Sequence, residues 1–197
     1  MRCGFAGIPY QYLDPFIKRG KTWIRTVDKP VRLKLSVATA PGKRWLSARL
    51  PSGGPRSIDS YGKWGVYRYG KIDVLLHYYA RHIDFSTPDD LKRLARAPHL
   101  ALEVVPPSCG ESFEFQVLWR GKPAAGSAVA VRGPNGFKAS LKTGKQGIAS
   151  FKVARPGRFT LHTIVEEKDK SGTDTGKKYD LVRHHGTLVI RLPAADK

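Results

Sequence analysis

Apolar and polar residues alternate along short stretches throughout the C-terminal half of the chain. From Phe113 to Trp119 every second residue is apolar, and Glu114 and Gln116 lie between them. This period of two is typical of a strand with one buried face. Turn sequences such as 121–123 follow such stretches at intervals of about eight to twelve residues. The pattern predicts an all-β fold, an antiparallel β-sandwich.

Other predicted strands share the same alternation or an enrichment in β-branched and aromatic residues. They cover 31–37, 62–69, 72–83, 100–105, 128–131, 137–141, 148–153, 159–165, 179–183 and 187–192. A polar, charged loop is expected over 166–178. One helix is predicted over 88–97, because Pro88 suits a first helical turn and two aspartates follow it at the positive end of the helix dipole.

The chain of 197 residues is long enough for one large or two small domains. We expect a basic β segment over 1–70, a connecting strand and short helix over 71–107, and the β-sandwich over 108–193. No apolar run approaches the roughly 18 residues of a membrane span, so no transmembrane segment is expected. Lysine and arginine exceed aspartate and glutamate by 35 to 16, which gives a net charge of +19. This excess favours anionic partners or surfaces.

The positive charge is densest near the N-terminus, where cations mix with Trp23. The candidate residues for binding an anionic surface are Lys18, Arg19, Lys21, Arg25, Arg32 and Lys34. Such a mixture suits a phosphate backbone, an anionic membrane or a cell-wall polymer, and it also suits an ordinary solvated face. Nucleic acid is the least expected partner, because the sequence has neither an RRM aromatic signature nor a helix-turn-helix.

The first residues do not read as an export signal. Pro9, Gln11 and Asp14 interrupt the apolar stretch that a signal peptide needs. Either the protein is cytoplasmic or this sequence is a processed or truncated version of an exported protein. Cys3 and Cys109 lie far apart, and they are either unlinked thiols or one disulfide of an oxidising compartment.

Two blocks of sequence resemble known families. The segment FEFQVLWRGKPAAGSAVAVRGPNGFKASLKTGKQGIASFKVARPGRFTLHTIV resembles Cna-B-like, carboxypeptidase-regulatory-like and transthyretin-like domains. With KIDVLLHYYARHID and LALEVVPP before it and GKKYDLVRHHGTLVIRL after it, the chain is similar to a domain-of-unknown-function family. Exported bacterial members of that family are often described as periplasmic components of nickel or cobalt uptake.

This resemblance implies an immunoglobulin/transthyretin-like sandwich preceded by a smaller, truncated β segment. It also implies a periplasmic or extracellular location and nickel or cobalt as the metal partner. The fold implication is the stronger one, since a fold does not set a function.

Histidine is the natural protein ligand for nickel or cobalt. His184 and His185 are adjacent in sequence and should point to opposite faces of a strand, as should His77 and His82. A site therefore needs neighbouring strands, with His162 meeting one of the His184–His185 pair. The candidate metal ligands are His162, His184, His185 and, less favourably, His77. The alternative is a set of isolated surface or capping histidines.

No pattern points to catalysis. Glu166, Glu167 and Asp169 lie among lysines and are typical of a solvated hairpin tip, and no serine lies in a G-x-S-x-G motif. We therefore expect a non-enzymatic extracytoplasmic binding or accessory module linked, by resemblance, to transition-metal uptake. The alternative is a structural or adhesion-type module that binds anionic polymers through its charge.

Overall fold

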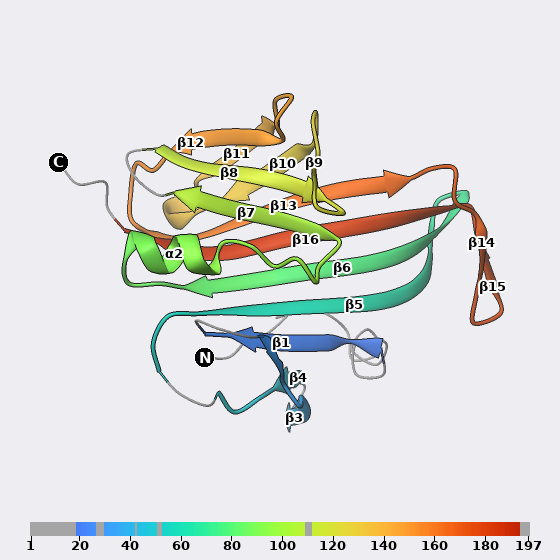
Figure 1. Cartoon of the computed structure of the whole chain (residues 1–197). Helices are drawn as coiled ribbons and strands as arrows, with labels where there is room; N and C mark the ends of the chain where they lie inside the picture. Colours follow the sequence, from blue (N-terminus) through green and yellow to red (C-terminus); the bar gives the residue numbers. More distant parts are fainter. Residues whose placement is uncertain (1–18, 27–29, 42, 51–52, 109–111, 194–197) are drawn as a thin grey trace.

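Two β-sheets packed face to face form the body of the molecule (Figure 1). The structure is a computed structural model, and it describes residues 19–26, 30–41, 43–50, 53–108 and 112–193. The larger sheet has eight strands in the order β11-β10-β13-β16-β6-β5-β1-β2, and the smaller has the order β12-β8-β7, with the short β9 paired to β8. The all-β sandwich predicted from the sequence is confirmed.

The strands of the large sheet are β1 (Lys21–Arg25), β2 (Pro30–Arg32), β5 (Arg56–Tyr69), β6 (Ile72–Asp84), β10 (Ala128–Arg132), β11 (Lys138–Lys142), β13 (Gly157–Glu167) and β16 (Leu181–Leu192). Those of the small sheet are β7 (Leu102–Ser108), β8 (Ser112–Trp119), β9 (Lys122–Pro123) and β12 (Ile148–Lys152). Two hairpins stand apart as two-stranded sheets, namely β3 (Ser36–Ala40) with β4 (Lys43–Ser47), and β14 (Gly172–Asp174) with β15 (Lys177–Tyr179).

All strand pairs are antiparallel except one. β16 runs parallel to β6, with His184 opposite His77 and Ile190 opposite Ile83. A parallel pair needs a long crossover connection. Here the crossover contains α2, the whole small sheet, the β10, β11 and β13 strands of the large sheet, and the β14–β15 hairpin.

The core lies between the two sheets. We call the face of the large sheet that covers this core the inner face and the opposite face the outer face. Phe113, Phe115 and Val117 of β8 are fully buried against Leu188 and Ile190 of β16, which are also fully buried. Alternate residues of each strand point to opposite faces, so the predicted alternation is what places this apolar set inside. Trp119, the last residue of β8, is half-buried, as its place in the alternation predicts.

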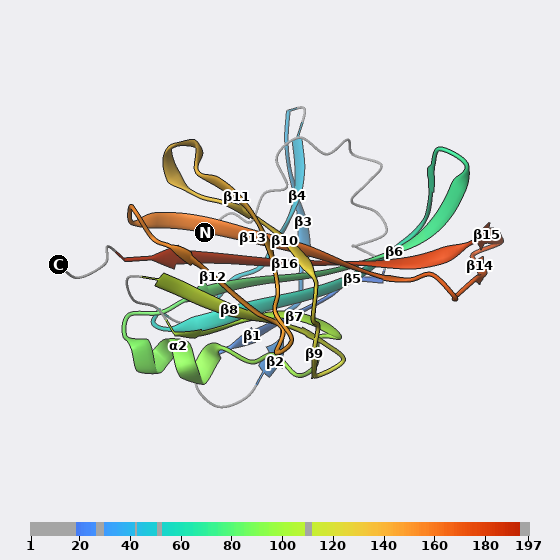
Figure 2. The ribbon, with the colours of Figure 1, turned by 90° about the horizontal axis from the view of Figure 1, so that it is seen from above.

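The predicted helix is present as α2 (Pro88–Leu94), shorter than expected at its C-terminal end. Thr87 and Asp90 form a capping box, in which the Thr87 side chain accepts from the Asp90 N–H and the Asp90 side chain accepts from the Thr87 N–H. Leu91 and Leu94 are buried against the sandwich. In Figure 2, α2 and the small sheet lie on one side of β16, and the β3–β4 hairpin lies on the other.

Three sequence predictions need correction. The stretch 31–37 is two strands rather than one, because β2 ends at Arg32 and the N–H of Leu33 donates to the carbonyl of Thr22. The predicted pair 179–183 and 187–192 is mainly the single strand β16, whose residues pair without a break along β13. The loop predicted over 166–178 contains the β14–β15 hairpin.

The large sheet crosses the expected segment boundaries. The boundary at 70 cuts the turn between β5 and β6, which pair along nearly their whole length. The boundary at 107 separates β7 from its partner β8. Strands expected in a basic segment and a connector therefore contribute to the same sandwich. Cys3 and Cys109 lie outside the described residues. No helix in the described part of the chain is both long and apolar enough to cross a membrane.

Candidate functional site

The histidines meet around one central strand. β16 lies between β13 and β6 and carries His184 and His185, which point to opposite faces. In the register, His184 is opposite His77 of β6, and His185 is opposite Ile164 of β13. The four predicted metal ligands therefore form two pairs on two faces of the sheet rather than one group.

His162 and His185 form the outer-face pair. Nε2 of His162 lies 3.1 Å from Nδ1 of His185, and the rings are 5.3 Å apart between centroids with an interplanar angle of 16°. The nearly coplanar rings point at each other, so they share one proton in a hydrogen bond. Tyr78 stacks on His185 at 4.6 Å and 8°. Nε2 of His185 is buried and has no hydrogen-bond partner.

Both histidines of this pair are neutral at pH 7. Burial, followed by the neighbouring His162 and Arg183, lowers the pKa of His185 to about 4. Burial, followed by Arg132, also lowers the pKa of His162. Neutral imidazole is the form that binds a metal ion, so neither ring needs to lose a proton first.

The spacing of the outer-face pair suits two neighbouring metal ligands. Metal–nitrogen bonds are about 2.0–2.1 Å long, so two imidazole nitrogens at right angles around one ion lie about 3 Å apart. A metal ion would enter after the shared proton has moved to the other nitrogen of its own ring, which keeps both imidazoles neutral, and after a rotation of at least one ring. Among the described residues, no three His, Cys, Asp or Glu side chains are grouped to hold a metal ion. The protein would therefore supply two ligands and water the rest.

His77 and His184 form the inner-face pair, with ring centroids 5.0 Å apart. Tyr61 Oη lies 2.9 Å from Nδ1 of His77, and Tyr79 Oη lies 3.3 Å from Nδ1 of His184. Nε2 of His184 is 3.0 Å from Glu167 Oε1. Burial, followed by the neighbouring His184 and Lys63, lowers the pKa of His77 to about 4.

This inner-face pair is closed in by its neighbours. Trp119 packs on the ring of His184 at 4.4 Å, and the guanidinium of Arg120 covers Trp119 at 4.7 Å. Arg120 and Lys170 both form ion pairs with Glu167. The tyrosines and Glu167 were not candidates in the sequence, because their approach depends on the register of β5, β6 and β13.

The predicted N-terminal cations differ in their surroundings. Arg19 forms an ion pair with the buried Asp174 of the β14–β15 hairpin at 2.9 Å. Arg25 donates to the carbonyl of Leu94 at 2.6 Å, and burial lowers its pKa. Lys18 lies outside the described residues. The remaining three candidates are exposed, namely Lys21, Arg32 and Lys34.

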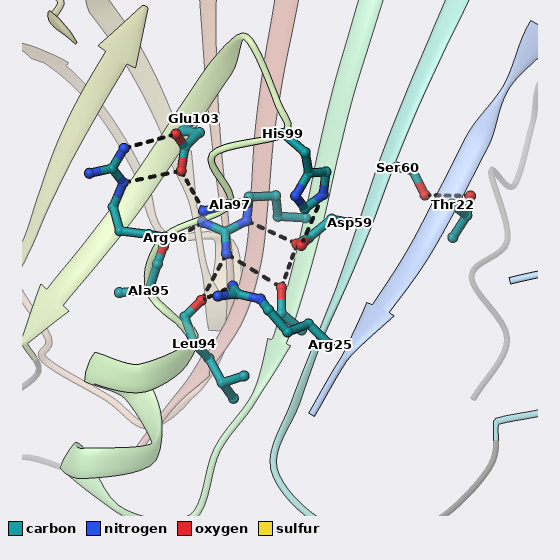
Figure 3. A network of polar contacts seen from close by, with 12 residues as sticks. Thr22, Arg25, Asp59, Ser60, Leu94, Ala95, Arg96, Ala97, His99 and Glu103 are labelled. Atoms are coloured by element: carbon teal, nitrogen blue, oxygen red, sulfur yellow. Dashed lines mark hydrogen bonds and ion pairs between the residues drawn. The ribbon is translucent and has the colours of Figure 1, made fainter. Parts of the chain in front are cut away.

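A buried polar network joins β5 and β6 to the end of α2 (Figure 3). Arg81 donates to the Asp59 carboxylate at 3.1 Å, to the Leu94 carbonyl at 2.9 Å and to the Ala95 carbonyl at 2.6 Å. Ser57 also donates to Asp59. The side chains of Arg81 and Asp59 are 1% and 0% exposed, so no ligand reaches them in this state. The network anchors the helix and is a structural element, which the sequence did not predict.

The chain matches one family model. Residues 83–167 match a domain of unknown function, DUF4198. No curated protein and no solved structure matches the chain. The DUF4198 segment runs from the end of β6 through α2 to the end of β13, so it includes His162 but not His77, His184 or His185. The expected family of unknown function is supported over this segment, and the link to nickel or cobalt stays a prediction.

Proposed function

We propose that this protein is a non-enzymatic binding module of the periplasm or extracellular space that takes up nickel or cobalt on its outer face through His162 and His185. The observation that supports the proposal is the 3.1 Å approach of two imidazole nitrogens from neighbouring strands. Both imidazoles are neutral at pH 7, as a borderline divalent ion requires. The resemblance to exported metal-uptake proteins supports the choice of metal and of compartment.

Binding is expected to be weak. Two protein ligands leave most coordination positions to water, which suits an ion that must be passed on. The net charge of +19 repels a dication, and Arg183 and Arg132 lie close to the two rings. We therefore expect a dissociation constant in the micromolar range or above, equivalent to roughly 8 kcal/mol or less.

The ion pairs formed by two glutamates support the non-enzymatic part of the proposal. Glu166 is held by Arg183 at 2.7 Å, and Glu167 is held by Arg120 at 2.7 Å. At Glu167 these contacts outweigh the effect of burial and lower the pKa, whereas a general acid must keep its proton near neutral pH.

The alternative function, binding of anionic polymers through the N-terminal cations, is not proposed for that segment. Arg19 and Arg25 already have partners within the chain, Asp174 and the Leu94 carbonyl. Their charge and donors are therefore largely used by the fold.

Isothermal titration calorimetry of the full chain with Ni²⁺, Co²⁺ and Zn²⁺ tests the metal proposal. Binding should disappear in His162→Ala and His185→Ala and should weaken only well below pH 6.5, because protons compete for the imidazoles and burial lowers the pKa of both. His82→Ala is the matched control, since His82 lies on the outer face of β6 but pairs with Asp84. The absence of both heat and a melting shift would overturn the proposal, as would loss of binding in His77→Ala with retention in His162→Ala.

A further inference from the structure

Two pairs of like charges lie directly opposite each other on neighbouring strands. Arg132 of β10 is opposite Lys138 of β11, and Arg158 of β13 is opposite Arg191 of β16. All four side chains are exposed. Like charges in directly opposite positions destabilise a sheet. A fold that brings two such pairs together therefore carries a repulsion that an anionic partner would relieve.

The two pairs form one surface, which we call the outer-face cation patch. Thr160 is opposite Arg132 and lies two residues from Arg158 on the same strand, so Arg132 and Arg158 are diagonal neighbours on the same face. Their alternating neighbours Val131 and Phe159 are buried in the core, which confirms that the four cations point outward. Four adjacent strands thus present the patch from a rigid support.

The described part of the protein does not neutralise the patch. None of its four cations forms an ion pair with a residue that the structure describes. In the strand register, the outer-face carboxylate nearest to the patch is that of Asp84. Asp84 directly follows Ile83, which is opposite Ile190 of β16. Asp84 is already paired with Arg56 and His82. Glu166, farther along β13, is held by Arg183.

We propose that the outer-face cation patch binds a linear polysaccharide that carries closely spaced sulfate or carboxylate groups. Guanidinium groups form paired hydrogen bonds with planar or tetrahedral oxyanions, and three of the four cations are arginines. Opposite side chains on paired strands lie about 5 Å apart and diagonal ones about 7–8 Å. This array can therefore contact several anionic groups of one extended chain.

The surroundings of the patch favour this polymer over the other polyanions. The outer-face residues next to the cations on β10, β11 and β13 are Ala130, Ser140 and Thr160, and the nearest ring of this face, that of His162, is half-buried and hydrogen-bonded to His185 rather than open for stacking a base. Val189 of β16, opposite Thr160, is half-buried, which leaves little apolar surface beside the cations to enter a lipid bilayer. A continuous sheet face is suited to a polymer that lies along it. None of the four cations is a proposed metal ligand, although Arg132 lies close to His162, so the patch goes beyond the proposed metal function.

Binding of the full chain to immobilised heparin, which is sulfated, and to polygalacturonate, which is carboxylated, tests the proposal. The patch variant replaces Arg132, Lys138, Arg158 and Arg191 by glutamine. The control variant replaces the exposed Lys122, Lys145, Lys168 and Lys178 by glutamine. Both lose four charges from +19 and reach +15, so a difference between them cannot come from net charge.

The patch variant should bind one or both polymers at least tenfold more weakly at about 0.15 M salt, and its affinity should depend less steeply on salt. The control should change by less than twofold. Equal losses in the two variants would overturn the proposal, because they would indicate net charge alone. Tighter binding of single-stranded DNA than of either polysaccharide would also overturn it. Melting curves check folding, and the patch variant should melt at the same or a higher temperature because repulsion is removed.

Discussion

Arg81 of β6 and Asp59 of β5 form an ion pair almost entirely removed from water, with Nε 3.1 Å from Oδ1. The same guanidinium donates to the carbonyls of Leu94 and Ala95, which are orphan acceptors at the end of α2. A buried charge is tolerated only where such partners surround it. The pair therefore links the centre of the large sheet to α2, which lies within the segment that matches DUF4198.

Removal of one partner should be strongly destabilising. Arg81→Met leaves Asp59 buried without its cation and the helix carbonyls without a donor, so the free energy of unfolding should fall by about 3–5 kcal/mol. Urea unfolding measures this loss. The double variant Arg81→Met/Asp59→Leu should recover part of it, because no unpaired charge remains. A loss of less than about 1 kcal/mol in the single variant would show that the pair does not anchor the helix.

Stability should decrease as the pH falls from about 6.5 to about 4. The pKa values of His77 and His185 are about 4 in the folded protein and about 6.5 in an unfolded chain, so the unfolded state binds more protons in this window. Protonation therefore favours unfolding, and the loss of stability due to these histidines levels off below their folded pKa of about 4. The lowered pKa values of Glu167 and Asp174 add a further loss only at more acidic pH.

Urea melts at pH 7.5, 6.0 and 5.0 measure this histidine effect before the carboxylates contribute. The double variant His77→Gln/His185→Gln should show a smaller loss of stability between pH 7.5 and 5.0 than the wild type. An unchanged slope in the variant would rule out these two histidines as its source.

Gly186→Ala should destabilise the sandwich by about 1–3 kcal/mol. Gly186 lies on β16 directly after the two histidines, and a Cβ there would come within 2.8 Å of Leu102 Cγ and 3.3 Å of Thr163 Cγ2. The small sheet approaches the large one too closely for a side chain. Gly144→Ala is the control, because its nearest contact would be 3.7 Å. Thermal melting should separate the two variants, and equal effects would contradict close packing at Gly186.

A chain that ends at residue 180 should not unfold cooperatively. It lacks β16, the strand between β13 and β6, and therefore loses Leu188, Ile190 and Leu192 from the core. Each buried side chain of this size contributes roughly 1.5–3 kcal/mol. Two long strand edges would also be left unpaired. A soluble fragment with a sharp urea transition would contradict this expectation.

Local patterns accounted for much of the fold. The alternation in β8, the strand-forming residues of β6 and the Pro-Asp-Asp start of α2 each act over a few residues, so they can be read directly. The opposite directions of His184 and His185 follow from the same period. The continuity of β16 was not predicted, because the sequence pattern indicated one strand over 179–183 and another over 187–192. Gly186 lies between them, and the close approach of Leu102 requires a glycine there.

The candidate sites depend on contacts that local sequence patterns do not predict. The period of two in the sequence allows His162 to meet only one member of the His184–His185 pair. The partner is His185, because the register of β13 against β16 fixes which residues lie diagonal to each other. The Arg81–Asp59 pair and the outer-face cation patch likewise join residues far apart in the chain. Strand order and register, set by the packing of the whole core, create these contacts, and no short stretch of sequence contains them.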